Sequence, residues 1–248
     1  IPSKDLLHLT KNIEEAKHKK NARRLYEEPK NDIKKVAEYK SGVVKKLTGG
    51  LDAMAKMRKV NHIQGYATFL DEHSVEVALT NSDEKTKVSF DYCIIAAGSQ
   101  SSKMSFIPHE DPRIWDSTDA LEVKEVPKKL LILGGGIIGL EMGTVYSTLG
   151  SQVDVAIRGE QLMTGTDADL IKLYTKANKD RFNIMSKTQT QSIIPKQDGI
   201  YVEFKGENAP KEGILYDAVL VALGRSANGN KLGLENTNVE VDEQGLIK

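Results

Sequence analysis

Cysteine is almost absent from this chain, because Cys93 is the one cysteine among 248 residues. A single thiol excludes an internal disulfide framework and any metal site built from several cysteines, and it favours a reducing, cytoplasmic environment. No metal site is predicted. Cys93 lies in the apolar run DYCIIAAG, and unpaired cysteines are usually buried, so we expect a packed core thiol in a strand.

An excess of charge and a long hydrophobic run are also missing. The 35 basic and 35 acidic residues cancel, so no overall field favours nucleic acid or an anionic membrane. No apolar run approaches the roughly 20 residues of a membrane span, and no segment has the pattern of a signal peptide. The hydrophobic content of 39% is enough to build the core of one large domain or two ordinary ones.

The first half of the sequence changes its pattern near residue 60. Apolar residues at helical spacing predict two amphipathic helices, over 3–20 and 32–57, joined by a loop. Short alternating runs over 60–95 then predict an antiparallel meander that ends in the buried strand DYCIIAAG. The polar, proline-containing residues 99–126 are typical of a connection between domains.

The second half alternates strands and helices, which is typical of a parallel sheet. We expect a Rossmann-like α/β fold with an antiparallel meander and a domain boundary near Pro127. The runs FDYCIIAAG and YDAVLVALG resemble each other, which suggests two related domains. The expected elements are strand 129–133, glycine turn 134–136, helix 137–149, strand 152–157, helix 167–179, strand 182–186, meander 187–215 and strand 216–224.

A G-x-G-x-x-G motif carries the clearest chemistry in the sequence. Gly134, Gly136 and Gly139 directly follow the apolar strand KLLIL and open a helix, which is the context that makes this motif specific. Gly134 permits the tight turn, Gly136 leaves room for a pyrophosphate, and Gly139 lets the helix approach the sheet. The unpaired amides at the helix start then face the phosphates. A nicotinamide dinucleotide is therefore predicted here.

The preference between NAD and NADP is open. An acidic residue is expected at the end of the second strand to accept the ribose hydroxyls, but this position holds Ile157. Asp154 points to the opposite face by strand alternation, whereas Glu160 is an alternative acceptor from the loop. Arg158 is suited to a 2′-phosphate, and it is equally well explained as an exposed loop arginine.

Several motifs in order resemble those of the pyridine nucleotide disulfide oxidoreductases. They are IPSK at 1–4, IIAAGS at 94–99, GGGIIGLEMG at 134–143 and VALGR at 221–225. The segment HEDPRIWDSTDAL at 109–121 is most similar to bacterial dihydrolipoamide dehydrogenases within that family. The resemblance extends over nearly the whole chain.

This resemblance implies an FAD-dependent enzyme that passes electrons between a nicotinamide dinucleotide and a disulfide, with lipoyl groups or domains of 2-oxo acid dehydrogenase complexes as partners. It also implies a homodimer. In the family, redox cysteines precede IPSK and a C-terminal domain completes the enzyme. We therefore expect an incomplete piece, inactive as written. The implied domains are the later FAD-binding domain at 1–126, the NAD(P)-binding domain at 127–225 and a return segment at 226–248.

Two other interpretations remain open, a dinucleotide-binding fragment without catalysis and a sister NADP-dependent disulfide reductase.

Under the resemblance, Lys4 is the lysine beside the flavin and Glu141 is its carboxylate partner, and a cation there stabilises the reduced ring. The implied cofactor-binding positions are Lys4, Gly65, Ala67, Ala97, Gly98, Gly134, Gly135, Gly136, Ile137, Ile138, Gly139, Ile157, Arg158, Thr190, Gly224 and Arg225.

Overall fold

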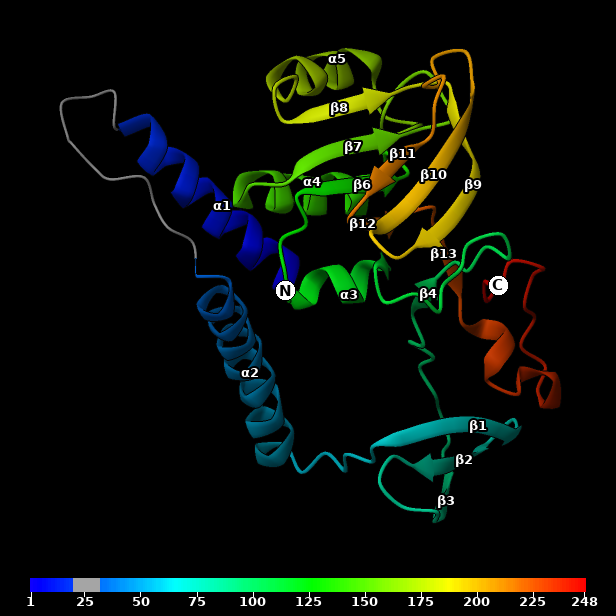
Figure 1. The fold of residues 1–248 in the computed structure, drawn as a ribbon. Coiled ribbons are helices and arrows are strands. Elements are labelled where there is room, and N and C mark those ends of the chain that lie inside the picture. The colour runs from blue at the N-terminus through cyan, green and yellow to red at the C-terminus, as the bar shows by residue number, and fades with distance from the viewer. Residues whose placement is uncertain (20–31) are drawn as a thin grey trace. The chain divides into compact units, whose positions relative to one another are not determined.

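The computed structural model describes residues 1–19 and 32–248, and these form two compact units (Figure 1). Unit 1 contains residues 1–47 and 103–224, and unit 2 contains residues 48–102 and 225–248. The loop predicted between the first two helices lies outside the described residues. The family resemblance implies different boundaries, after residues 126 and 225, and these boundaries stay a prediction.

A five-stranded parallel sheet forms the centre of unit 1. The central strand KLLIL is apolar throughout and pairs on both sides, which is why its side chains are almost completely buried. In spatial order the strands are β5 (Ile114–Trp115), β12 (Ala218–Val221), β6 (Lys129–Leu133), β7 (Gln152–Ala156) and β8 (Phe182–Met185).

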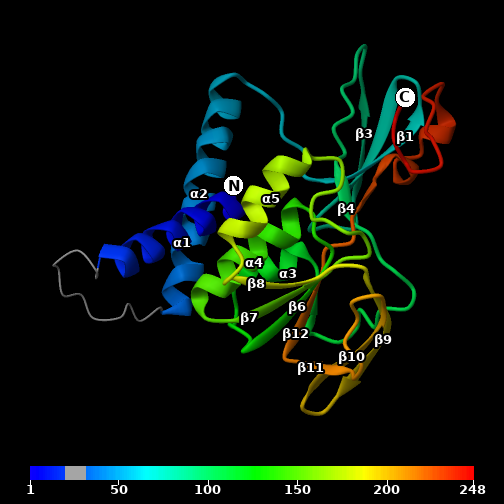
Figure 2. The same cartoon turned by 90° about the horizontal axis from the view of Figure 1, so that it is seen from above.

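Each face of this sheet is covered by a different layer, as Figure 2 shows from above. Leu130 and Ile132 of β6 face the helical layer, whereas Leu131 and Leu133 face a three-stranded antiparallel sheet. The core of unit 1 therefore lies on both faces of β6. The layers are helices α1 (Pro2–Lys19), α3 (Ser117–Glu122), α4 (Ile137–Leu149) and α5 (Ala168–Ala177), and strands β9 (Thr188–Lys196), β10 (Gly199–Gly206) and β11 (Ile214–Tyr216).

Helices α1 and α2 (Ile33–Met57) are amphipathic, and their buried residues connect them to unit 1. Leu6 of α1 joins the helical face of the core, and Thr10 and Ile13 are buried on the same helix. Lys40 of α2 is buried as well, and its Nζ donates a hydrogen bond of 2.7 Å to the carbonyl of Leu121 at the end of α3. This bond pairs a cation with the negative end of a helix.

Unit 2 contains an antiparallel meander and a two-stranded sheet. The buried Phe69 and Val77 hold the meander together on one face. Its elements are β1 (Gly65–Asp71), β2 (Ser74–Leu79) and β3 (Lys85–Ser89), then β4 (Ser99–Ser101) paired with β13 (Arg225–Ala227), and the 3-10 turns η1 (Gly229–Lys231) and η2 (Leu234–Asn236).

The mixed α/β fold with parallel and antiparallel sheets is confirmed, and the helices and strands predicted for unit 1 lie close to their predicted bounds. Residues 99–126, predicted as a connection between domains, instead contain β4, β5 and α3. The buried strand predicted for DYCIIAAG is wrong. Residues 92–98 form no strand, Tyr92 and Ile94 are 95% and 93% exposed, and Cys93 is exposed, not a core thiol. Among the described residues no strand pairs with this run, and an apolar sequence is buried only where a partner covers it.

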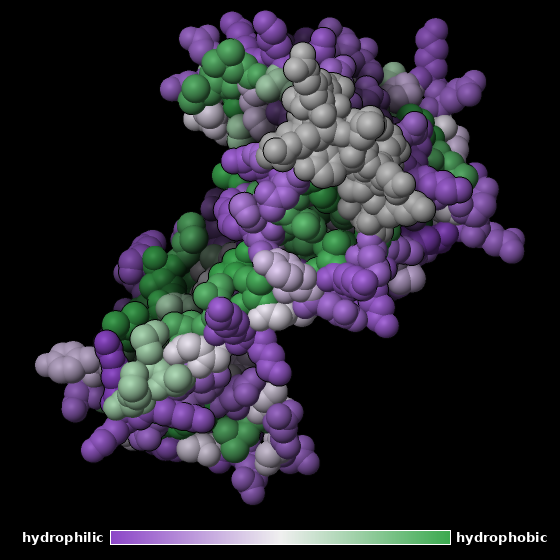
Figure 3. All heavy atoms as spheres, turned by 90° about the vertical axis from the view of Figure 1, so that its left-hand side faces the viewer, coloured by the Kyte–Doolittle hydropathy of each residue, from purple (hydrophilic) through white to green (hydrophobic). Residues whose placement is uncertain are grey.

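Other apolar side chains also reach the surface, and Figure 3 shows such residues in green on the face that it presents. Leu170 and Leu173 of α5 are examples in unit 1. The described helices include none that combines the length and the apolar character needed to cross a membrane.

Candidate functional site

The turn between β6 and α4 needs glycine for two separate reasons. Gly134 has φ +104°, in the left-handed region, and a Cβ added there would lie 2.4 Å from the carbonyl oxygen of Ala222. A Cβ at Gly139 would lie 2.5 Å from the carbonyl oxygen of Gly134. Larger residues would therefore move α4 away from the sheet.

Gly136 differs from these two glycines, because an added Cβ would meet no described atom within 4 Å. It is the N-cap of α4, and within the described part of the chain no side chain caps this helix start. The first amides of α4 and the positive end of its dipole are therefore available to an anion. Packing does not require glycine here, whereas a phosphate that approaches the backbone does.

A cleft of about 620 Å³ opens beside this turn. Its walls come from the carboxyl ends of β6, β7 and β12, where open parallel sheets bind ligands. Ile157, Arg158, Thr190 and Gly224 line it, together with the residues 134–137 of the turn. The cleft thus combines an apolar floor with a few polar groups, as ligand sites commonly do.

Sequence reasoning missed several residues of this cleft. Met104 and Phe106 reach it from the segment before β5, Gln161 from the loop after β7, and Thr188 from the start of β9. The one usable signal was the position of Gln161, which closely follows the end of a central strand. The other three carry no motif and are brought to the cleft only by folding.

Arg158 and Glu160, which follow β7 in the sequence, have different surroundings. Arg158 is exposed at the cleft, and no ion pair engages its guanidinium within residues 1–19 and 32–248. Glu160 instead pairs with Lys187 at 2.9 Å. Lys187 also pairs with Glu207 at 2.9 Å. The hydrogen bond to Glu207, and after it the hydrogen bond to Glu160, raises the pKa of Lys187. The alternative acceptor Glu160 therefore has its carboxylate turned to a lysine outside the cleft lining.

Asp154 lies away from the cleft, as strand alternation predicted. It is buried and accepts hydrogen bonds of 2.8 Å from the Tyr216 hydroxyl and 2.9 Å from the Asn183 amide. Burial, and after it the charge of Asp154, raises the pKa of Tyr216, so this phenol stays a neutral donor. This network joins the parallel sheet to the antiparallel layer and has no part in the cleft.

Lys4 of α1 and Glu141 of α4 form an ion pair within unit 1. The Lys4 ammonium donates to Oε1 of Glu141, across 137 positions of sequence. The Lys4 side chain is 73% exposed and that of Glu141 is 18% exposed. The Lys4 ammonium therefore lies at the surface, whereas the Glu141 carboxylate with which it pairs is mostly buried against unit 1.

The remaining candidate residues lie in unit 2 and form a separate group. Arg225 donates from Nε to Oγ of Ser99 at 2.7 Å, and the carbonyl of Ala97 accepts from the Asn228 amide at 2.9 Å. Gly98 has φ +65°, in the left-handed region.

Gly65 has a packing explanation, because a Cβ there would lie 2.3 Å from the Ala78 carbonyl oxygen. Ala67 pairs with Val77 in the same meander and is half-buried. In the part of the chain that the structure describes, no group of three or more His, Cys, Asp or Glu side chains could hold a metal ion.

Comparison with known proteins gives a consistent set of relatives. The family described as pyridine nucleotide-disulphide oxidoreductase matches residues 1–248. Dihydrolipoyl dehydrogenases from Vibrio cholerae, Haemophilus influenzae and Bacillus subtilis are 54%, 51% and 35% identical over 248, 247 and 252 residues. Each match covers 100% of this chain and 52%, 51% and 52% of these relatives, so the chain spans about half their length.

A solved structure supports the fold. The HOCl-induced flavoprotein disulfide reductase RclA from Escherichia coli superposes with a TM-score of 0.82 at 24% identity, over 100% of this chain and 51% of that protein. At this level of identity the similarity concerns the fold alone.

Proposed function

Because this chain belongs to the pyridine nucleotide-disulphide oxidoreductase family, we propose that it is part of an FAD-dependent enzyme passing electrons between a nicotinamide dinucleotide and a dithiol or disulfide. The relatives named dihydrolipoyl dehydrogenase support dihydrolipoamide as the substrate. The partners would then be lipoyl groups or domains of 2-oxo acid dehydrogenase complexes. A homodimer in the cytoplasm is part of the same proposal.

The observation that carries the proposal is the free space at Gly136 beside the uncapped start of α4. A pyrophosphate fits there, because backbone amides and the helix dipole favour a dianion and no side chain of the described residues lies within 4 Å of a Cβ at Gly136. Thr190 and Gly224 would border the rest of the nucleotide along the cleft. Ile137 and Ile138 follow Gly136 in the first turn of α4, and Gly135 precedes it.

Gly135 allows the turn to pack closely against Ile157 and Leu162. A Cβ at Gly135 would lie 2.7 Å from Ile157 Cγ2 and 2.7 Å from Leu162 Cδ2. The close approach of these three residues keeps the turn against the end of β7, where the adenosine ribose would lie. Ile157 supplies an apolar contact there and no acceptor for ribose hydroxyls.

We propose that the coenzyme is not strongly restricted to NAD. Arg158 lines the cleft, and no described residue forms an ion pair with its guanidinium, which suits a 2′-phosphate. Glu160, the nearest acidic alternative, is held by Lys187. NADP therefore remains a fitting coenzyme beside NAD.

The Lys4 and Glu141 pair suits a flavin. When bound, FAD supplies two-electron transfer between the nicotinamide and the dithiol, and its reduced ring carries negative charge. Lys4 would stabilise that charge and Glu141 would orient Lys4. Ala97, Gly98, Gly65, Ala67 and Arg225 are proposed as further flavin and nucleotide contacts, as the family resemblance implies.

The test is the variant Gly136→Val. Gly136 has φ −81° and ψ 177°, an extended conformation that valine adopts readily, so folding should be preserved. The added methyl groups would occupy the pyrophosphate position and weaken NADH and NADPH binding by roughly tenfold or more, which corresponds to about 1.4 kcal/mol.

The matched control is Gly42→Ala in α2, which also fills open space among the described residues. Its coenzyme affinity should equal that of the unmodified protein. Fluorescence titration gives the affinities, and circular dichroism verifies the fold. Unchanged affinity in Gly136→Val would contradict the nucleotide site.

A further inference from the structure

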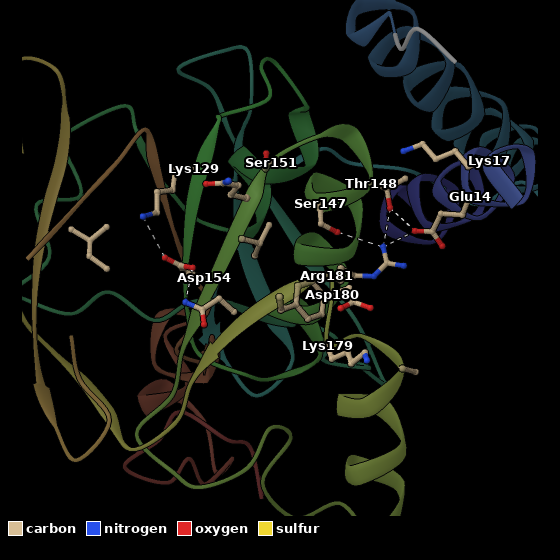
Figure 4. Close-up of a pocket in the computed structure, with 16 residues that line it drawn as sticks. Glu14, Lys17, Lys129, Ser147, Thr148, Ser151, Asp154, Lys179, Asp180 and Arg181 are labelled. Atoms are coloured by element: carbon tan, nitrogen blue, oxygen red, sulfur yellow. Dashed lines mark hydrogen bonds and ion pairs between the residues drawn. The ribbon is translucent and has the colours of Figure 1, made fainter. Parts of the chain in front are cut away.

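Helix α1 contacts α4 at two polar points as well as through apolar packing. The first point is the pair of Lys4 with Glu141. The second lies farther along both helices, where Oε1 of Glu14 accepts from Arg181 Nη1 at 2.6 Å and from Thr148 Oγ1 at 2.7 Å. Figure 4 shows Glu14, Thr148 and Arg181 pointing toward one another, from α1, α4 and the turn that directly precedes β8.

Other hydrogen bonds fix the position of the Arg181 side chain in addition to its contact with Glu14. Its Nε donates to Asn178 Oδ1 at 3.0 Å, and its Nη1 donates to Thr148 Oγ1 at 2.9 Å and to Ser147 Oγ at 3.4 Å. Thr148 is buried, and the Arg181 side chain is only 22% exposed. A guanidinium fixed in this way is a directed donor, unlike the mobile head of a surface lysine.

The spacing of the two points limits how α1 can move. Lys4 and Glu14 are ten residues apart, about 15 Å along the axis of α1. Glu141 and Thr148 are seven residues apart, about 10.5 Å and nearly two turns, so they lie on one side of α4. Two polar contacts that are so far apart restrict the sliding and rotation of the helix, whereas apolar packing alone is non-directional.

We propose that the contact of Glu14 with Arg181 and Thr148 is a positioning clamp that sets α1 in the register where Lys4 reaches Glu141. Arg181 and Thr148 belong to the nucleotide-binding part of unit 1, so the clamp ties the helix that carries Lys4 to that part. Glu14 and Arg181 are positioning residues, because they act through α1. The consequence for flavin chemistry rests on the proposed function, whereas the consequence for the Lys4 contact does not.

The ordinary alternative is a surface ion pair of little value, as most exposed pairs are. Three observations favour the clamp. The Glu14 carboxylate accepts hydrogen bonds from two separate segments, and the Thr148 side chain that donates one of them is buried. The Arg181 side chain also donates three further hydrogen bonds, to Asn178, Ser147 and Thr148. The hydrogen bond from Arg181, the largest influence, also lowers the pKa of Glu14.

The experiment breaks the clamp and then restores it with opposite charges. Glu14→Lys places a cation against Arg181, and adding Arg181→Glu re-forms the pair in the reverse sense. The matched control is Glu15→Lys, the same charge change at the neighbouring position, whose carboxylate pairs at 4.0 Å with Lys11 of α1 itself. Glu14→Gln keeps the side-chain size and serves if Glu14→Lys does not fold.

Two measurements are made on the full-length protein loaded with FAD. Crystal structures report whether Lys4 still contacts Glu141, and potentiometry reports the midpoint potential of the flavin. We expect Glu14→Lys to lose the contact and to shift the potential to more negative values, because a cation beside the reduced ring is displaced. The exchanged pair should restore both readings, and Glu15→Lys should change neither.

Retention of the Lys4 contact with Glu141 in Glu14→Lys and in Glu14→Gln would overturn the clamp. Loss of the contact with an unchanged flavin potential would support the clamp and contradict the flavin role of Lys4. The two failures are therefore distinguishable.

Discussion

Lys4 and Glu141 are in contact although 137 positions separate them, and the contact joins the first turn of α1 to the helix that opens at the glycine turn. The exposed ammonium and the largely shielded carboxylate make an asymmetric pair. Such a pair contributes little to stability, because an exposed lysine is well solvated with or without its partner. Its importance should therefore lie in function.

Glu141→Gln is expected to separate these two effects. The free energy of unfolding should change by less than about 1 kcal/mol, since the Lys4 ammonium is mostly exposed. The flavin midpoint potential of the full-length protein should become more negative, because Lys4 loses the group that orients it. Urea unfolding and potentiometry measure the two quantities. A stability loss well above this value with an unchanged potential would assign the pair a structural role.

The coenzyme preference depends on Arg158. We expect the affinities for NADH and NADPH to differ by less than a hundredfold, or about 2.7 kcal/mol. Arg158→Gln should weaken NADPH binding by about tenfold and NADH binding much less, because only NADPH carries the 2′-phosphate. Lys172→Gln on α5 is the control, because Lys172 pairs with Asp169 at 3.9 Å and does not line the cleft.

Titration with both reduced coenzymes gives these ratios. A preference for NADH of a hundredfold or more would show that another group has taken over the acidic role. Glu160 would then have to leave Lys187, which a structure of the complex would reveal.

The strand, turn and helix over 129–149 were predictable because local chemistry and tertiary structure agree there. Apolar β6, the glycines and the helical periodicity of α4 each indicate the same structure. The run 92–98 is apolar, as β12 is, but among the described residues no strand pairs with it. Composition indicates a preference for burial, and only a partner can satisfy it.

The site was predictable only in part, for a related reason. The glycine motif fixes the turn locally, so Gly134, Gly136 and Gly139 could be identified from spacing. Thr188 of β9 lines the cleft only because the chain folds, and no local sequence pattern indicates its position there. The bond between Glu14 and Thr148 spans 134 positions, and no local pattern in the sequence indicates that these two residues meet.

The buried Tyr216 hydroxyl should contribute to stability through Asp154. Tyr216→Phe removes a donor from a buried carboxylate, which typically costs about 1–3 kcal/mol. The control is Tyr201→Phe in β10, since no hydrogen bond of the Tyr201 hydroxyl occurs within residues 1–19 and 32–248. Urea unfolding at pH 7 measures both variants. Equal stabilities of the two variants would contradict this assignment.

Acid should weaken the clamp. The hydrogen bond from Arg181 lowers the pKa of Glu14 below its ordinary value of 4.5, so Glu14 binds protons less readily when folded. This stabilisation is present above pH 4.5 and is lost as the pH falls through the lowered pKa. Unfolding free energies measured from pH 6 to 3 should therefore decrease less steeply in Glu14→Gln. An identical pH dependence in both proteins would show that Glu14 does not contribute.

The last prediction concerns turnover. Disulfide exchange needs one thiolate to attack sulfur and a second thiol to resolve the mixed disulfide, whereas these 248 residues contain only Cys93. Cys93 is exposed in a segment without regular structure, and the glycine turn belongs to the other compact unit. We therefore expect a polypeptide of this sequence to bind a nicotinamide dinucleotide and to show no lipoamide reductase activity.

The assay follows NADH- and NADPH-dependent reduction of lipoamide with excess FAD, on protein whose mass is verified as 27.4 kDa. Cys93→Ser is the control for adventitious thiol chemistry, and it should bind coenzyme as the unmodified protein does. Turnover that persists in Cys93→Ser would contradict the thiol mechanism itself, because no other cysteine remains. Activity that appears only in a longer polypeptide with a cysteine pair ahead of Ile1 would instead assign the reacting thiols to that added cysteine pair, as the family resemblance implies.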